Sequence, residues 1–171
     1  MRVFRLLSFT LPALIAALSA TAASAAVDVA FVAPEHYTDG GGKGGFGDLP
    51  VKAVVEREIR AHLTGLGERN LAPGQTLKIE VLDIDLAGRR DILGSSNGDV
   101  RVYDQLNSPR IRLRFTLEEG GQIVSSGEDL LTDPLYLNSL SRTSTGDPLR
   151  YERPMLTKWF LGRFGRHSQS G

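Results

Sequence analysis

The strongest constraint on the fold is the alternation of apolar and charged residues in the segment 109–119, PRIRLRFTLEE. Apolar residues fill every second position of 111–117, and the alternate positions from 110 to 116 hold Arg110, Arg112, Arg114 and a threonine. Successive side chains of a strand point to opposite faces, so this period of two predicts a strand with one buried and one wet face. We therefore expect a mostly antiparallel sheet that is open to solvent on one side.

A second strand is expected in 76–86, TLKIEVLDIDL, where the alternation changes phase. Apolar residues fall on odd positions up to Val81 and on even positions from Leu82. One inserted residue, a β-bulge, would keep both apolar sets on one face. The opposite face would then carry four charged residues: Lys78, Glu80, Asp83 and Asp85.

The spacing of Asp83 and Asp85 raises the question of a metal site or a catalytic pair. Residues two apart on a strand lie roughly 6.5–7 Å apart, and a hard cation needs several further oxygen ligands, which the sequence nearby does not supply. A hydrolase that uses these aspartates or Glu80 as acid and base is an alternative, but such pairs usually combine a buried and a solvated carboxylate. We predict no catalytic, cofactor-binding or metal-binding residue.

The acids and the arginines of the wet face can pair across adjacent strands. We predict ion pairs between the acids of 80–85 and the arginines of 110–114, each worth about 0.2–1 kcal/mol. Binding of an external anion or polysaccharide by the arginine-rich face remains the alternative. The candidate interaction surface consists of Asp83, Asp85, Arg110, Arg112 and Arg114.

The remaining segments complete the expected fold. Alternation predicts a short strand in 27–33 and a brief one in 99–104, and three- and four-residue spacing predicts a helix from about Leu49 that Gly65 and Gly67 end. Gly120-Gly121 closes a hairpin, and the polar strand after it suits a sheet edge.

The last part of the domain is expected to be helical. Asp147 and Pro148 are typical of a helix start, Pro154 must lie in a first turn or divide the segment, and aromatic residues follow at helical spacing. Such a basic amphipathic helix could lie on a membrane, but the sheet needs a cover for its apolar face. The sequence predicts an α+β domain: a mostly antiparallel sheet of about four to five strands, a helix after the first strand, and a C-terminal helix packed on one face.

The N-terminus predicts export. Arg2 and Arg5 precede an apolar run, and Ala23-Ser24-Ala25 follows it, which is the pattern of a signal peptide. We expect cleavage after Ala25, one globular domain over 26–164 with a flexible glycine-rich loop at 39–47, and a disordered tail at 165–171. The mature protein is expected to be soluble, in the periplasm or secreted, with no transmembrane segment.

Composition excludes several classes. The chain has no cysteine, so it has no disulfide, no thiolate metal site and no lipid-bearing cysteine. Loss of the leader removes two arginines and no acid, which turns a formal net charge of 0 into −2 and argues against nucleic-acid binding.

Three segments, PGQTLKIEVLDIDLAG, PRIRLRFTLE and GDPLRYERPMLTKWF, together resemble an uncharacterised family of small exported bacterial proteins, domain of unknown function 3016. The resemblance covers most of 27–164 and implies no activity. The order of elements is also similar to that of envelope-lipoprotein domains that serve as accessory subunits of transport systems. The favoured interpretation is a non-catalytic binding or accessory module of the cell envelope with a protein partner; the sequence leaves the oligomeric state open.

Overall fold

The computed structural model describes residues 24–39, 49–90, 101–138 and 147–165. Three sequence predictions fall largely outside these ranges: the signal peptide, the glycine-rich loop and the C-terminal tail.

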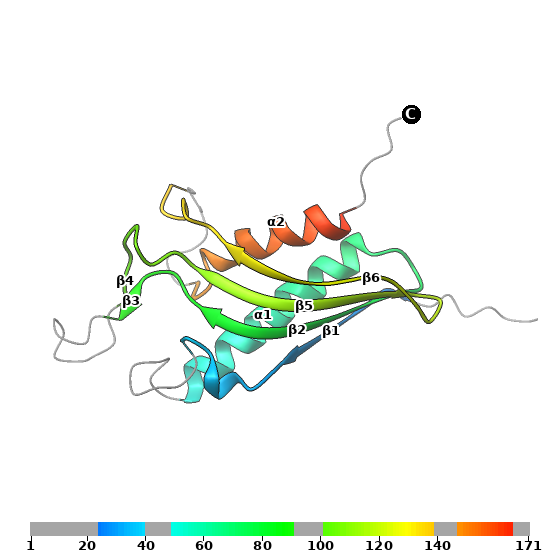
Figure 1. The fold of residues 1–171 in the computed structure, drawn as a ribbon, viewed down its shortest axis with the longest axis horizontal. Helices are drawn as coiled ribbons and strands as arrows, with labels where there is room; N and C mark the ends of the chain where they lie inside the picture. The colour runs from blue at the N-terminus through cyan, green and yellow to red at the C-terminus, as the bar shows by residue number, and fades with distance from the viewer. Residues whose placement is uncertain (1–23, 40–48, 91–100, 139–146, 166–171) are drawn as a thin grey trace, which may run out of the picture.

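Four strands form the main sheet, in the order β1-β2-β5-β6 (Figure 1). They are β1 (Ala26–Phe31), β2 (Gln75–Asp85), β5 (Arg110–Glu119) and β6 (Gln122–Thr132). β1 runs parallel to β2, whereas the β2–β5 and β5–β6 pairs are antiparallel. The sheet is therefore mixed but mostly antiparallel, and its two edges are β1 and β6.

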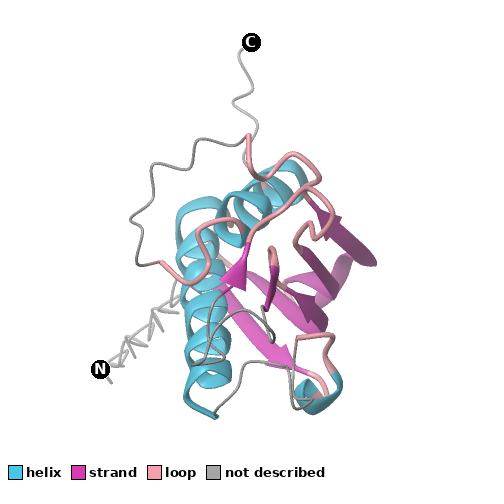
Figure 2. Ribbon diagram, turned by 90° about the vertical axis from the view of Figure 1, so that its left-hand side faces the viewer, coloured by secondary structure: helices cyan, strands magenta, loops and turns pink. Residues whose placement is uncertain are grey.

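Both helices lie on the same face of this sheet. α1 (Leu49–Asn70) forms the crossover between β1 and β2, because the chain must return along one face of the sheet before it can enter a parallel strand. α2 (Glu152–Phe164) comes after β6 in the chain. Figure 2 shows both α-helices on one side of the four strands; the other helical segment of the described residues is the short 3-10 helix Pro34–His36, which follows β1. The predicted α+β architecture, with a C-terminal helix on one face, is confirmed.

The core lies between the helices and the two central strands. Seven apolar side chains of β2 and β5 are at most 1% exposed: Leu77, Ile79, Val81, Ile84, Ile111, Leu113 and Phe115. Val81 and Ile84 share the buried face, although they are three residues apart, because the β2–β5 register shifts between Val81 and Asp83. The predicted bulge is therefore confirmed, and it lets one strand keep a single apolar face through a change of phase.

α1 is longer than its glycines predict. The prediction that Gly65 and Gly67 end the helix is wrong, because α1 continues to Asn70. Gly67 allows a close approach instead: a Cβ atom there would lie 2.0 Å from Cγ2 of Val27 in β1. Contact between α1 and the edge strand therefore outweighs the low helix propensity of glycine.

α2 begins later than the Asp147-Pro148 pattern predicts, at Glu152. Asp147 stabilises the turn before the helix, where its Oδ1 accepts the backbone N–H of Leu149 at 2.9 Å. Pro154 lies in the first turn of α2, where the missing N–H has no helical partner to lose.

The aromatic side chains of α2 cover the sheet, as expected. Trp159 and Phe164 make edge-on contacts with Phe115 of β5, with ring centroids 6.1 Å and 5.4 Å apart. Such contacts add about 0.5–1.5 kcal/mol each to the burial of the rings.

A short ribbon lies apart from the main sheet. It pairs β3 (Arg89–Arg90) with β4 (Arg101–Val102). The brief strand predicted in 99–104 is therefore seen at Arg101–Val102 in the described residues, and it does not join the main sheet.

Candidate functional site

The open face of the sheet brings the candidate interaction surface together on β2 and β5. Three acids of β2 lie directly opposite three arginines of β5: Glu80 opposite Arg114, Asp83 opposite Arg112, and Asp85 opposite Arg110. The bulge makes this possible, since it returns the two aspartates to the face that Glu80 occupies. The sequence therefore predicts the right neighbours, but not all of their contacts.

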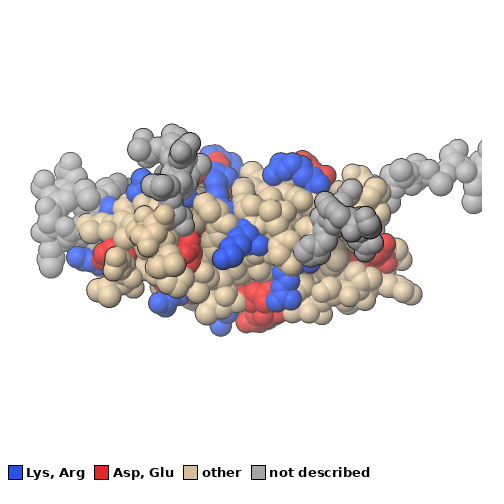
Figure 3. Space-filling view, turned by 90° about the horizontal axis from the view of Figure 1, so that it is seen from above, with Lys and Arg blue, Asp and Glu red and all other residues tan. Residues whose placement is uncertain are grey.

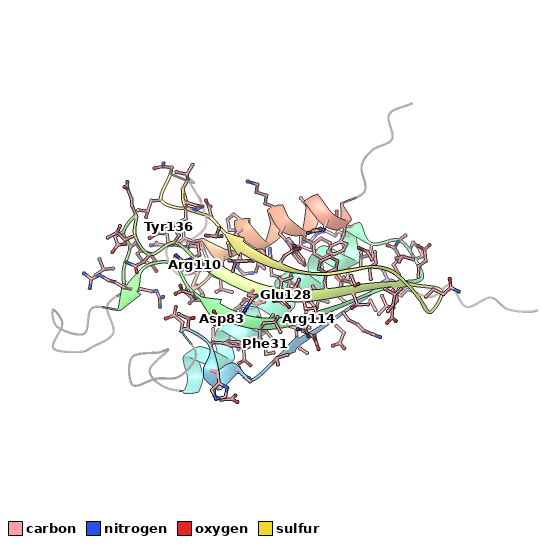
Figure 4. All side chains as sticks on the ribbon, in the orientation of Figure 1. Phe31, Asp83, Arg110, Arg114, Glu128 and Tyr136 are labelled. Carbon is pink, nitrogen blue, oxygen red and sulfur yellow. The ribbon has the colours of Figure 1, made fainter. Side chains whose placement is uncertain are left out.

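Arg114 forms the one predicted ion pair seen among the described residues. Its Nη1 lies 2.9 Å from Oε2 of Glu80, and its Nη2 lies 3.4 Å from Oε2 of Glu128 on β6. Figure 4 shows Arg114 and Glu128 together near the middle of the sheet. All three side chains are about half exposed, so each pair contributes only about 0–1 kcal/mol.

The prediction that Asp83 pairs with an arginine of β5 is wrong, because both of its carboxylate oxygens bind Thr38. Asp83 Oδ1 accepts the backbone N–H of Thr38 at 2.7 Å, and Oδ2 accepts the Thr38 hydroxyl at 2.9 Å. Both carboxylate oxygens thus hold the segment after β1 against β2. Periodicity could not show this contact, because the two residues are 45 positions apart in sequence.

Asp85 also forms no ion pair within 4 Å with an arginine of β5 among the described residues, although Arg110 lies directly opposite it. Burial raises the pKa of Asp85, and the charge of Asp39 raises it further, while Arg110 and Arg101 lower it. Arg110 is therefore close enough to act on the carboxylate, but partial burial has the larger effect.

Arg110 and Arg112 form no ion pair with any acidic residue of the described chain, and both are exposed. Arg112 lies opposite Leu130 of β6, whose side chain is 65% exposed. A guanidinium offers five donors in a fixed plane, well suited to an external carboxylate or phosphate. We call these two arginines the cationic strip.

A second polar cluster surrounds the backbone at 86–88, directly after β2. The N–H of Leu86 donates to Oδ2 of Asp39 at 2.7 Å, and the N–H of Ala87 donates to Oε1 of Glu152 at 2.8 Å. The Arg101 guanidinium donates to the carbonyl oxygens of residues 86, 87 and 88, and also to Asp39. This cluster joins β2, the ribbon and the start of α2.

Glu152 is the buried ionisable residue of this cluster, with 2% of its surface exposed. Burial raises its pKa, while the hydrogen bond from Ala87 and the charge of Arg101 lower it. A raised carboxyl pKa can indicate a catalytic acid. Here Oε1 is engaged by backbone, and the nearby guanidinium of Arg101 is bound to carbonyl oxygens, so the arrangement anchors α2 to the end of β2.

Sequence reasoning missed the residues of this cluster: Asp39, Arg101 and Glu152. A signal was nevertheless present: DIDLAG (83–88) and DPLRYE (147–152) lie within two of the three family-like segments, and the structure brings Ala87 of the first against Glu152 of the second.

A tyrosine cluster beside it was missed as well. The Arg150 guanidinium lies 4.5 Å and 4.6 Å from the ring centroids of Tyr103 and Tyr151, a cation–π arrangement. Buried Tyr136 packs edge-on against Tyr151 and donates its hydroxyl to the Asp104 carbonyl at 2.6 Å. These contacts join three loops that are distant in sequence.

A groove of about 410 Å³ runs between β6 and α2. Residues 129–132 form one wall, and Met155, Lys158, Trp159, Gly162 and Arg163 form the other. Asp129 connects the walls: it accepts the Trp159 indole N–H at 2.8 Å and an Arg163 N–H at 2.6 Å. Figure 3, which looks onto the side where α2 and β6 lie uppermost in Figure 1, shows more uncharged than charged surface there.

No helix of the described chain is long and apolar enough to cross a membrane. Within the same residues there is no group of three or more histidine, cysteine, aspartate and glutamate side chains suited to a metal ion.

Two helices on one face of a mixed four-stranded sheet, with a charged opposite face, define a small α+β protein. The chain belongs to the family described as "Protein of unknown function (DUF3016)", whose model matches residues 25–162. The resemblance inferred from its three sequence segments is thus confirmed.

A comparison with curated proteins found no match. Among solved structures, the crystal structure of protein XCC0632 from Xanthomonas campestris, family-model DUF330, is similar at 19% sequence identity and a TM-score of 0.31. The alignment covers 68% of this chain and 60% of that protein. A likeness at this level carries no argument about function.

Proposed function

We propose that this protein is an exported, non-catalytic binding module of the cell envelope, which recognises a protein partner through the open face of its sheet. The observation that carries the proposal is the cationic strip, Arg110 and Arg112. These side chains stand on a central strand, exposed and without an acidic ion-pair partner among the described residues. Groups on a rigid strand are already placed for binding, which reduces the entropy lost when a partner docks.

The perturbed titratable groups support a non-catalytic role, because they are held in contacts within the fold. Burial raises the pKa of Tyr37 to about 12, and its hydroxyl donates to the Val81 carbonyl at 2.7 Å. Burial lowers the pKa of His62, whose Nε2 lies 2.9 Å from Oγ1 of Thr157 in the contact between α1 and α2. These interactions join elements of secondary structure.

Export is proposed from the leader-like N-terminus. β1 starts at Ala26, directly after the expected cleavage bond, and the family match starts at residue 25, which is consistent with a mature chain beginning there. Intact-mass analysis of the protein from a bacterial envelope fraction tests this: loss of residues 1–25 is expected, and an unprocessed chain confined to the cytoplasm would contradict it.

Binding of an anion or an acidic polysaccharide is the second candidate, favoured by the same two arginines. Asp83 and Asp85 lie directly opposite them and would repel a bare anion, whereas a protein surface can present both signs of charge. Direct titration with inorganic phosphate and with dextran sulfate separates the candidates, since a protein-binding module should bind neither tightly.

Affinity capture with chemical cross-linking from the native envelope tests the protein-binding proposal. Wild type is compared with the double variant Arg110→Glu/Arg112→Glu and with the control Arg57→Glu, an exposed change on α1. A partner that is recovered with wild type and the control but lost with a folded double variant is the expected result. A partner retained by the double variant would show that the open face is not the binding surface.

A further inference from the structure

The free edge of β6, beside the groove along α2, has features that the proposed function does not use. β6 is the outer strand of the sheet, and in the described part of the chain no backbone hydrogen bond reaches 122–132 from its outer side. An edge strand presents unpaired N–H and C=O groups, which are a template for another strand.

The opposite edge of the sheet is protected. β1 has six residues, and Arg60 of α1 donates to the Val29 carbonyl at 3.2 Å while its guanidinium lies over the Phe31 ring. β6 has eleven residues, and its sequence contains neither lysine nor proline, two common means of blocking an edge. A bulge near Val124 interrupts the ladder close to the hairpin, so the regular edge runs from Ser125 to Thr132.

The groove beside this edge can distinguish between the side chains of a strand that adds to β6. Leu131 and Met155, each 6% exposed, provide apolar surface, and Gly162 leaves α2 without a side chain at one point of the wall. Lys158 is exposed and has no ion pair with a described residue, whereas Arg163 forms an ion pair with Asp129. A strand edge beside a helix-lined groove is a known arrangement for β-strand addition, in which backbone bonds supply affinity and alternate side chains supply specificity.

We propose that an extended acidic segment of the partner protein adds to β6 as a fifth strand, with an apolar side chain in the groove and a carboxylate beside Lys158. Charge complementarity favours this occupant, because Lys158 and Arg163 outnumber Asp129 in the lining. The inference rests on the proposed function, and it specifies the segment that the partner supplies.

Gly162 allows a sharp test. A Cβ atom at this position meets no atom within 4 Å, so a side chain can begin here without a clash, and Gly162→Phe adds a large one to the wall of the groove. Ala61→Phe, an exposed change on α1, is the matched control. Circular dichroism and urea unfolding of both variants establish that they are folded.

The probe is a random linear-peptide library displayed on phage, selected on the purified full-chain protein. Enriched peptides should alternate β-forming residues with Asp or Glu. Gly162→Phe and Lys158→Glu should each weaken the best peptide by about tenfold or more in fluorescence anisotropy, and Ala61→Phe should leave its affinity unchanged. Absence of enrichment, or equal binding to the filled variant, would overturn the inference.

Two further results separate this inference from the proposed function. A partner captured equally by Gly162→Phe but lost in the Arg110→Glu/Arg112→Glu variant would overturn strand addition and leave open-face binding in place. A wild-type dimer that becomes monomeric in Gly162→Phe, measured by sedimentation, would show that a second copy occupies the edge, and would also overturn the proposal.

Discussion

The close approach of α1 to β1 predicts opposite effects for the same substitution at two helical glycines. Alanine is favoured over glycine within a helix by about 0.8–1.0 kcal/mol. At Gly162 the added Cβ meets open space, so Gly162→Ala should stabilise the protein by up to about 1 kcal/mol. At Gly67 the Cβ would lie 2.0 Å from Cγ2 of Val27, and overpacking of this kind costs about 1–3 kcal/mol.

Urea unfolding followed by circular dichroism measures both variants. Gly67→Ala should be less stable than Gly162→Ala by about 1–3 kcal/mol, the overpacking cost alone, since both changes alter helix propensity in the same way. In a Val27→Ala background the clashing methyl group is gone, and the remaining Val27 Cβ is 3.3 Å away, so most of the difference should disappear. Equal stabilities of Gly67→Ala and Gly162→Ala in the wild-type background would refute the close contact between α1 and β1.

Three further changes test other parts of the structure. In urea unfolding, Glu152→Gln should gain stability relative to wild type as pH rises above 4.5. Burial raises the pKa of Glu152 in the folded state, so the folded wild type holds a proton that its unfolded chain releases, and wild type loses stability. A parallel pH dependence of the two proteins would contradict this. Asp129→Ala should destabilise the fold by about 1–3 kcal/mol and shift the emission of Trp159, the single tryptophan, through loss of the acceptor of its indole N–H; an unchanged spectrum would disprove that contact. Thr38→Val removes only one of the two hydrogen bonds to Asp83 and should cost about 0.5–1.5 kcal/mol at neutral pH in the same unfolding assay, whereas a fully unfolded variant would be inconsistent with an exposed contact.

The strands and their faces were predictable because period two is a local property of the sequence. The alternation in 110–117 and the phase change at Val81 fix which side chains are buried, and the structure agrees at both places. The end of α1 was not predictable in this way, since the role of Gly67 depends on Val27, which lies on another element.

For the candidate surface, the sequence predicts that acids and arginines lie on neighbouring strands, but it does not predict which hydrogen bonds and ion pairs they form. The alternation fixes which residues face outward, so acids and arginines on one open face could be inferred, whereas the register that sets them opposite one another is seen in the structure. The actual partner of Asp83 is Thr38, and the partner of Glu152 is the backbone of Ala87. Such long-range polar contacts depend on loop paths that periodicity does not encode.

Site-specific photo-cross-linking in living cells tests the central claim most directly. A photoreactive amino acid replaces Leu130, which is 65% exposed and lies on β6 opposite Arg112, or replaces Ala61 on α1 as a control. We predict a discrete protein adduct in the envelope fraction from position 130 and none from position 61. An adduct from position 61 alone, or from neither position, would contradict a partner that binds at the open face and edge of the sheet.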